Sequence, residues 1–209
     1  MASETEVSPR IFAHRGLWTS PGEQNSRSAI ENAFLSGFAV ETDVREYLGR
    51  IVLSHDVPNS ALDLHELALT GVDRFAINIK QDGMLEKFQI YRDEILSSDS
   101  FLFDGSIPEM YKARTMGLPH ALRMSEFEQD IPWKSDYLWI DGFESDWWLG
   151  DSRFRGLAED FHLIFVSPEL HGRSHNNAFD WFAELNAKED FLFSVCTDFP
   201  LELKRYLYE

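Results

Sequence analysis

Short apolar segments alternate with longer amphipathic ones along the chain, and this alternation constrains the fold more than any other feature. Eight segments have the length and composition of buried strands: 10–14, 38–44, 75–80, 101–105, 121–125, 137–143, 162–167 and 191–198. Segments with helical spacing follow them, at 26–36, 62–70, 84–96, 108–116, 125–129, 146–160, 178–186 and 201–208. Strands that alternate with helices build parallel sheets, and eight such units predict a closed (β/α)8 TIM barrel.

An open, doubly wound sheet is the alternative fold for such an alternation. It would carry a Gly-rich phosphate loop after the first strand, and HRGLWTSPG (14–22) lacks the G-x-G-x-x-G spacing. The 209 residues contain no low-complexity linker and no sequence repeat. We therefore expect a single domain over residues 1–209, with residues 1–8 flexible.

The charge balance is strongly acidic, with 36 Asp and Glu against 19 Lys and Arg and a net charge of −17. This opposes binding to nucleic acids or anionic membranes and is compatible with capture of a divalent cation. The single cysteine, Cys196, permits no internal disulfide and indicates a reducing compartment. The N-terminus lacks a secretory signal pattern, and no apolar run is long enough to cross a bilayer. We expect a cytoplasmic protein without a transmembrane segment, and the oligomeric state is left open.

A second pattern, REYLGRIVLSHD (45–56), interrupts the alternation after the second strand. Two short extended runs flank a turn at Gly49, which predicts a β-hairpin inserted there. A hairpin returns the chain close to its starting point. We therefore expect His55 and Asp56 to lie near Glu41 and Asp43.

Polar side chains stand at the end of every predicted strand. In a strand, residues i and i+2 share a face, so Glu41 and Asp43 point the same way. In a barrel the carboxyl ends of the strands form the mouth, where active sites are built. The residues at these ends are His14, Arg15, Glu41, Asp43, Asn78, Lys80, Asp104, Arg123, Asp141, Glu169, His171 and Asp198.

Taken singly, each of these residues also has a purely structural explanation. Glu41 and Asp43 are residues that commonly occur at a solvated strand end. Lys80 could be an ordinary exposed lysine at the end of its strand. Asp198 precedes Phe199-Pro200 and suits the N-cap of the last helix. His171 lies in a polar loop, where a surface histidine is common.

Their convergence favours a functional interpretation. Carboxylates such as Glu41 and Asp43 are the oxygen donors that Mg²⁺ and Ca²⁺ prefer. Two histidines, His14 and His55, can exchange protons near neutral pH. Cationic side chains, Arg15 and Lys80, can neutralise phosphate oxygens. A bound metal, an acid–base histidine pair and cationic side chains are together the components of phosphodiester cleavage.

An ordered set of motifs resembles the glycerophosphodiester phosphodiesterase family, within the larger group of phospholipase-C-like barrels. The motifs are H-R-G (14–16), E-x-N-S (23–26), E-T-D-V (41–44), H-D (55–56) and x-I-K (78–80). T-D-F-P (197–200) resembles the family's last strand-to-helix junction. Three further segments look like a short bacterial subgroup of this family: FDGSIPEMY (103–111), LRMSEFE (122–128) and VSPELHGR (166–173).

The resemblance implies specific roles in the hydrolysis of a small polar phosphodiester, with one divalent cation, Mg²⁺ or Ca²⁺, as cofactor. It implies that His14 and His55 are the acid–base pair. It makes Arg15 and Lys80 phosphate ligands. It makes Glu41, Asp43 and the residue at position 78 metal ligands.

Two departures from the family pattern bear on metal affinity and specificity. The family usually has Glu where this chain has Asn78, so the metal loses one charged ligand, which Asp104 could replace. Few residues separate His55 from the third strand, which predicts an open mouth. We expect specificity to come from the later strands, through Arg123, Trp139, Asp141, Glu169 and His171.

Two other functions are compatible with the same motifs. One is a lyase that stops at a cyclic phosphate product. The other is a non-catalytic barrel that binds phosphate or sugar phosphates, descended from the enzymes and weakened at Asn78.

Overall fold

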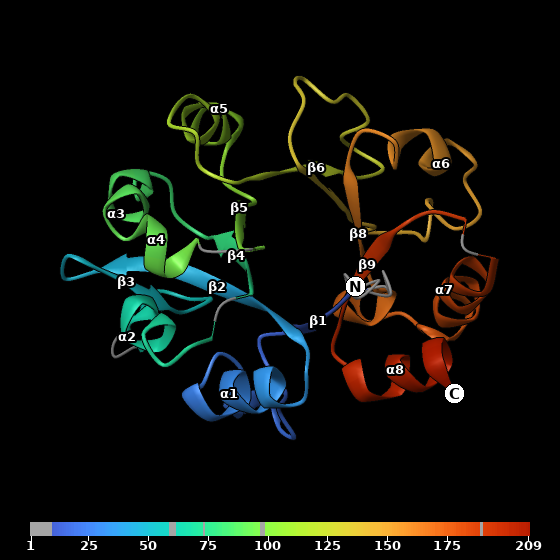
Figure 1. The fold of residues 1–209 in the computed structure, drawn as a ribbon, viewed down its shortest axis with the longest axis horizontal. Helices are drawn as coiled ribbons and strands as arrows, with labels where there is room; N and C mark the ends of the chain where they lie inside the picture. Colours follow the sequence, from blue (N-terminus) through green and yellow to red (C-terminus); the bar gives the residue numbers. More distant parts are fainter. Residues whose placement is uncertain (1–9, 59–61, 73, 97–98, 189) are drawn as a thin grey trace, which may run out of the picture.

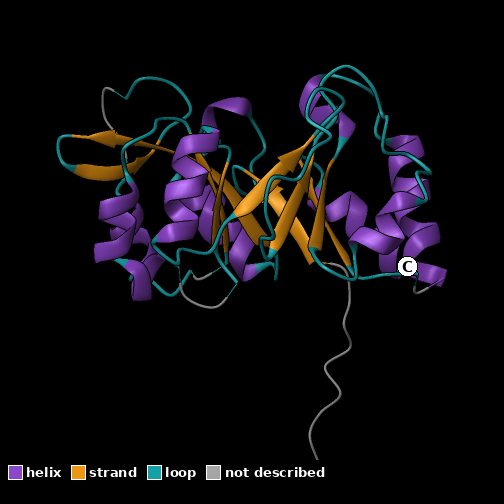
Figure 2. Cartoon of the chain, turned by 90° about the horizontal axis from the view of Figure 1, so that it is seen from above, coloured by secondary structure: helices purple, strands orange, loops and turns teal. Residues whose placement is uncertain are grey.

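The chain folds into a barrel of eight parallel strands surrounded by helices (Figures 1 and 2). The computed structural model describes residues 10–58, 62–72, 74–96, 99–188 and 190–209. The flexibility expected of residues 1–8 lies outside this range. Around the barrel the strands follow the order β5-β4-β2-β1-β9-β8-β7-β6. Their bounds are β1 Arg10–His14, β2 Ala39–Tyr47, β4 Phe75–Ile79, β5 Phe101–Phe103, β6 Ala121–Met124, β7 Tyr137–Ile140, β8 His162–Val166 and β9 Phe193–Thr197.

The barrel closes between β5 and β6. A parallel bridge joins Leu102 to His120, and the Leu102 amide donates to the Pro119 carbonyl at 3.0 Å. The predicted (β/α)8 barrel is therefore confirmed, and the open doubly wound alternative is wrong. Among the described residues, no helix is long and apolar enough to cross a membrane.

The predicted hairpin after the second barrel strand is also confirmed. β3 (Arg50–Leu53) pairs antiparallel with the far end of β2, with Val44 opposite Leu53. The connecting residues Leu48 and Gly49 have φ of 49° and 85°, the positive values that a two-residue type I′ turn needs. The hairpin projects from one side of the barrel (Figures 1 and 2).

Helices cover most of the outer surface of the sheet. They are α1 Arg27–Leu35, α2 Leu64–Ala68, α3 Leu85–Ile90, α4 Arg92–Ile95, α5 Ile107–Thr115, α6 Arg153–Leu157, α7 Asn176–Lys188 and α8 Pro200–Tyr208. The helix predicted over 84–96 is interrupted at Tyr91. The one predicted over 146–160 is reduced to α6, because Gly150 adopts φ 75° in the preceding turn.

The helix predicted over residues 125–129 is wrong. Ser125 and Glu128 form an antiparallel bridge instead, and the hydroxyl of Ser125 accepts a hydrogen bond from the amide of Phe127 at 3.2 Å. A serine that bonds its neighbouring backbone competes with a helix, and five residues are too few to offset the cost of helix nucleation. The connection from β6 to β7 therefore contains no helix.

The inside of the barrel is a small apolar core, and the polar site lies directly above it. Every second residue of a strand points inward, so on β2 Ala39 lies in this core and Glu41 and Asp43 follow it on the same face. Small residues such as Ala39 face large aromatic ones, including Phe103 and Trp139, whose rings stack 4.0 Å apart. Cys196 is buried in the same core.

Candidate active site at the mouth of the barrel

A cavity of about 250 Å³ lies at the carboxyl ends of the strands. It collects most of the side chains that the sequence assigns to a site. The residues predicted for the site that line it are His14, Arg15, Glu41, Asp43, His55, Asn78, Lys80, Asp141 and His171. Trp139 and Asp104 line it as well, whereas Arg123 and Glu169 do not.

The carboxylate of Asp43 contacts two cationic side chains and one amide at the mouth. Arg15 Nε lies 2.8 Å from its Oδ2, and Lys80 Nζ lies 3.2 Å from its Oδ1. Asn25 Nδ2 donates to Oδ2 at 3.1 Å. Burial alone would raise the pKa of Asp43, but the charges of Lys80 and Arg15 and the bond from Asn25 together lower it. Asp43 is therefore ionised at neutral pH.

Glu41 lies in a different electrostatic environment two residues earlier. Its side chain is 2% exposed, and its Oε2 is 3.8 Å from Nε2 of His14. Burial, and then the charge of Asp43, raise the pKa of Glu41 to about 7, against the opposing charges of His14, Lys80 and Arg15. A buried carboxylate beside another carboxylate is stabilised either by a proton or by a cation.

Three oxygens at this point of the mouth suit a cation. Glu41 Oε2, Asp43 Oδ1 and Asn78 Oδ1 are all buried, and none of them accepts a hydrogen bond, although the Lys80 ammonium lies 3.2 Å from Asp43 Oδ1 as an ion-pair partner. Asn78 is the direct neighbour of Asp43 in the register of β2 and β4. Carboxylate and amide oxygens are the donors that Mg²⁺ and Ca²⁺ take. The predicted ligand set therefore fits a hard divalent cation, with the neutral Asn78 as its third member.

Among the described residues, no further carboxylate, histidine or cysteine joins Glu41 and Asp43 as a charged metal ligand. Within the described part of the chain, His, Cys, Asp and Glu side chains nowhere gather in threes around a point suited to a metal. Asp104 lies on the cavity wall, but its Oδ1 accepts from Arg123 Nη1 at 2.7 Å. Burial raises the pKa of Asp104 even with Arg123 beside it. The structure thus pairs Asp104 with Arg123 and leaves Asn78 beside the carboxylates.

His14 ends β1 between two carboxylates. Its Nδ1 lies 2.6 Å from Oδ1 of Asp198, and its Nε2 faces Glu41. Burial lowers the pKa of His14, but the hydrogen bond to Asp198 and the charge of Glu41 outweigh it and raise the pKa above 6.5. The sequence suggested Asp198 as a helix N-cap. In the structure Phe199 is the N-cap of α8, and Asp198 orients His14.

His55 reaches the mouth from the hairpin. The amide of Ser54 donates to the carbonyl of Asp43 at 2.9 Å, which brings the chain back over β2 as expected. The His55 side chain is 48% exposed, and its Nδ1 lies 3.0 Å from Oδ1 of Asp56. The two histidines thus differ sharply: His14 is buried and fixed, whereas His55 sits at the solvent edge of the cavity.

The loop after β1 supports the carboxylates. Arg15 adopts φ 58° and Gly16 φ 95°, and a Cβ on Gly16 would come within 2.6 Å of the backbone of Ala29. Asn25 bonds back to this region, since its Oδ1 accepts from the Thr42 hydroxyl at 2.7 Å. Ser26 caps α1. The sharp turn therefore lets Arg15 and Asn25 both reach Asp43.

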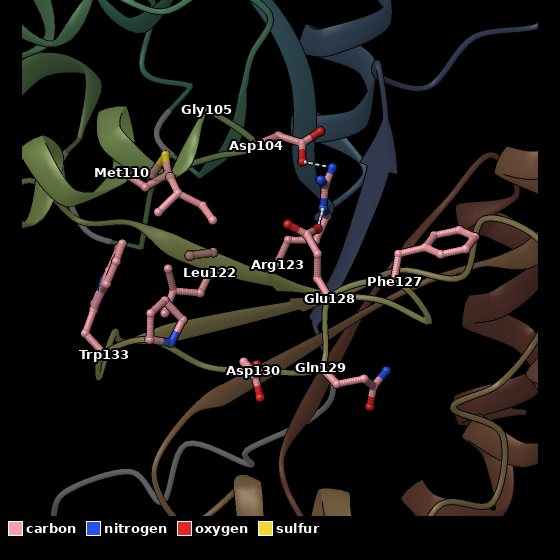
Figure 3. A pocket seen from close by; sticks show the side chains of 13 residues that line it. Asp104, Gly105, Met110, Leu122, Arg123, Phe127, Glu128, Gln129, Asp130 and Trp133 are labelled. Carbon is pink, nitrogen blue, oxygen red and sulfur yellow. Dashed lines mark hydrogen bonds and ion pairs between the residues drawn. The ribbon is translucent and has the colours of Figure 1, made fainter.

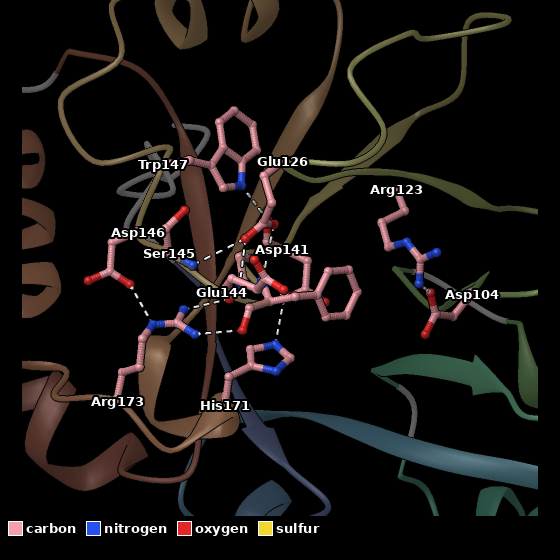
Figure 4. Close-up of polar contacts among 12 residues, drawn as sticks. Asp104, Arg123, Glu126, Asp141, Glu144, Ser145, Asp146, Trp147, His171 and Arg173 are labelled. Carbon is pink, nitrogen blue, oxygen red and sulfur yellow. Dashed lines mark hydrogen bonds and ion pairs between the residues drawn. The ribbon is translucent and has the colours of Figure 1, made fainter.

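A second histidine–aspartate pair lies on another wall of the cavity (Figure 4). His171 Nε2 is 2.7 Å from Oδ1 of Asp141, which also accepts from the amide of Gly142 at 2.8 Å. The loop that follows is held from two sides. Glu126 accepts the amides of residues 143, 144 and 145, and Arg173 donates to the carbonyls of residues 142 and 143. This wall is therefore rigidly positioned.

The two predicted residues that do not reach the cavity have other roles. Glu169 accepts from the Thr197 hydroxyl at 2.5 Å and from the amide of Asp198 at 3.0 Å. It thus fixes the segment that carries Asp198 rather than contacting the cavity. Arg123 pairs with Asp104 and with Glu128, at 2.7 and 2.6 Å, and lines a neighbouring cavity.

Comparison with known proteins bears on the fold. Comparison with protein-family models gives no match, and comparison with curated protein sequences gives none either. A glycerophosphoryl diester phosphodiesterase from Parabacteroides distasonis ATCC 8503 is similar in structure. Its TM-score is 0.63 at 16% sequence identity, over 96% of this chain and 86% of that one.

Dihydropteroate synthases are similar in structure as well. The Yersinia pestis enzyme has a TM-score of 0.51 at 9% identity, over 96% of this chain and 93% of that one. The Xanthomonas albilineans enzyme has 0.50 at 12% identity, over 95% and 91%. At such identities the likeness shows the barrel fold alone.

Proposed function

We propose that this chain is a metal-dependent phosphodiesterase that hydrolyses a glycerophosphodiester or a related small polar phosphodiester. One observation carries the proposal: three buried oxygens that accept no hydrogen bond, on Glu41, Asp43 and Asn78, share a cavity with His14 and Arg15. The barrel of a solved glycerophosphoryl diester phosphodiesterase, similar over most of both chains, supports it. The motifs in the first eighty residues point the same way.

The three oxygens would hold one divalent cation, Mg²⁺ or Ca²⁺. Bound there, it would neutralise Glu41 and polarise a phosphate oxygen as a Lewis acid. Arg15 and Lys80 both contact Asp43 and line the cavity, so their remaining N–H groups are available to phosphate oxygens. Two fixed cations thus orient the phosphate against the carboxylate pair.

His14 is suited to remove a proton from the nucleophile. With Nδ1–H donated to Asp198, its Nε2 is the free nitrogen and faces the cavity beside Glu41. In the proposed reaction a neighbouring hydroxyl of the substrate attacks phosphorus and gives its proton to Nε2. His55, at the solvent edge, donates a proton to the departing alcohol oxygen as the P–O bond breaks. The cyclic phosphate is then opened by water, with the proton roles reversed.

Hydrolysis of defined substrates tests the proposal. We expect turnover of glycerophosphodiesters with Mg²⁺, Ca²⁺ or Mn²⁺, and metal binding by calorimetry that disappears in Glu41→Gln/Asp43→Asn. Glu184→Gln, a 66% exposed carboxylate on α7, is the control and retains both. A parent protein that binds no divalent metal would overturn the proposal.

Phosphorus NMR of the product separates the related activities. Glycerol phosphate as the final product supports hydrolysis, whereas accumulation of the cyclic phosphate identifies a lyase. Binding of glycerol phosphate without turnover of any diester, under every metal, identifies a non-catalytic barrel instead.

A further inference from the structure

A second cavity lies where the barrel lacks a helix (Figure 3). β6 leads into residues 125–136, which cross the sheet as a loop rather than covering it with a helix. Between this loop and α5 a space of about 300 Å³ remains. This volume is at the lower end of small-molecule pockets, which span roughly 300–1,000 Å³.

The surfaces around this second cavity are largely apolar. Met110 from α5, Leu122 from β6 and Trp133 from the loop line it. Two further lining residues are unusually exposed for apolar side chains: Ile107 at 62% and Phe127 at 65%. Exposed apolar side chains gathered around a hollow are typical of a ligand-binding surface.

The second cavity shares a wall with the first cavity, at the Asp104–Arg123 ion pair. Asp104 lines both cavities. Arg123 lines the second cavity and pairs with Asp104. Its guanidinium lies 5.3 Å from the ring centre of Phe143, a residue that lines the first cavity. A molecule held at the metal oxygens therefore has this apolar space next to it.

The charges of the second cavity exclude anionic ligands. Asp104, Glu128 and Asp130 line it with only one cation, Arg123, which the first two already neutralise. A second phosphate or a carboxylate would meet like charge there. A neutral organic group would bury apolar surface without that cost.

We infer that this second cavity receives the apolar part of the substrate's leaving alcohol, so that the preferred substrates are glycerophosphodiesters whose second alcohol is alkyl or aryl. The inference rests on the proposed phosphodiesterase function. In the proposed function the glycerol phosphate unit would occupy the first cavity, of about 250 Å³, and the rest of a larger ester would extend beyond it. Arg123 then contributes to specificity from the second cavity.

A series of esters tests this assignment. Glycerol 3-phosphate esters of methanol, butanol, hexanol and phenol differ only in the leaving alcohol. We expect kcat/KM to rise about fourfold for each methylene that enters the second cavity. Filling the cavity with Ile107→Trp removes this dependence and leaves the methyl ester within twofold of the parent. Leu35→Asp, an 82% exposed position on α1, is the control and keeps the full dependence.

Binding of the free alcohol separates this inference from the proposed function. In Glu41→Gln/Asp43→Asn, 1-hexanol should still bind by ligand-observed NMR, and Ile107→Trp should abolish that binding. Equal kcat/KM for the methyl and hexyl esters overturns the inference and leaves the phosphodiesterase proposal intact. Failure to cleave any ester overturns both. Hexanol binding that Ile107→Trp does not change also overturns the inference.

Discussion

The mouth and the base of the barrel each hold a histidine whose proton affinity is shifted, and the two shifts are opposite. His14 is the last residue of β1, at the mouth, and His162 is the first residue of β8, at the base. The pKa of His14 is raised, whereas that of His162 falls to about 4. Burial is the largest influence on both, and in both it favours the neutral ring.

Neighbouring charge makes the difference between the two ends. At the mouth His14 faces Asp198 and Glu41, whose negative charges stabilise the imidazolium. At the base the ring of His162 bonds the neutral hydroxyl of Ser194, at 2.7 Å, and the charge of Arg10 lowers the pKa of His162 further. His120, at the start of β6, also has a lowered pKa, caused by burial.

Under the proposed function, this contrast separates chemistry at the mouth from stability at the base. At the mouth, carboxylates lie beside each other and beside a histidine. This arrangement lowers the folding free energy gained there, and it shifts pKa values towards neutral pH, where the groups can exchange protons. At the base, neutral histidines are satisfied by neutral partners. Barrel enzymes place catalysis at the mouth and stabilising contacts at the base.

The largest predicted effect is the difference in kcat/KM between a variant without His14 and a variant without His162. His14→Gln should lower kcat/KM for a glycerophosphodiester by about 10³-fold, because a general base contributes roughly 10²- to 10⁴-fold. His162→Gln, the matched change at the base, should leave kcat/KM within twofold. Steady-state kinetics on both variants, with circular dichroism to check folding, measures this. Equal losses in the two variants would show that His14 acts only in the fold.

The sequence predicted the fold well because the alternation of segments and the polar strand ends are local patterns. His14, Glu41 and Asp43 could be assigned to one cavity since parallel strands bring their carboxyl ends together. The hairpin could be placed because Gly49 marks its turn. The short loop helix over 125–129 could not be excluded, because the hydrogen bond from the Phe127 amide to the Ser125 hydroxyl leaves no periodic signal in the sequence.

The fine assignments at the mouth depended on contacts between distant strands. Asp198 is 184 residues from His14, and nothing in the local sequence distinguishes a helix cap from a histidine partner. Glu169 turned out to hold the Asp198 segment, and Arg123 to line another cavity. The loop conformation sets the direction of a side chain that follows a strand end. The spacing of residues along the strand does not determine that conformation.

A smaller effect should follow from neutralising the partner of His14. Asp198→Asn keeps a hydrogen-bond acceptor but removes the charge that stabilises the imidazolium. We expect kcat to fall about 10- to 100-fold, by analogy with the range seen when the hydrogen-bonded partner of a metal-ligating histidine is changed. KM and the metal affinity should change less than threefold, because Asp198 contacts neither the proposed ligands nor the phosphate side chains.

Asp99→Asn is the control for this change at the base of the barrel. Asp99 Oδ2 accepts from Arg10 at 2.8 Å, and its side chain is 46% exposed. An exposed pair of this kind contributes about 0–1 kcal/mol, so kcat should stay within twofold. If Asp198→Asn raised KM and weakened metal binding as much as it lowered kcat, the aspartate would support the cavity as a whole instead of His14.

The smallest predicted effect is on folding stability in acid, and it arises from His162 at the base of the barrel. His162 has a folded pKa of about 4, below the value near 6.5 of an unfolded histidine. Between these values the unfolded chain binds a proton that the folded chain does not. The free energy of unfolding therefore falls as pH drops from 6.5 towards 4, and the stabilisation is complete only above 6.5.

His162→Gln should flatten this dependence, because glutamine does not titrate in that range. Relative to its own value at pH 8, the variant should lose about 2 kcal/mol less than the parent by pH 4.5. Urea unfolding at both pH values, followed by tryptophan fluorescence, measures the difference. Identical acid sensitivity in the two proteins would show that His162 is protonated in the folded state. The base would then tolerate an imidazolium as the mouth does, and the contrast between the two ends would not hold.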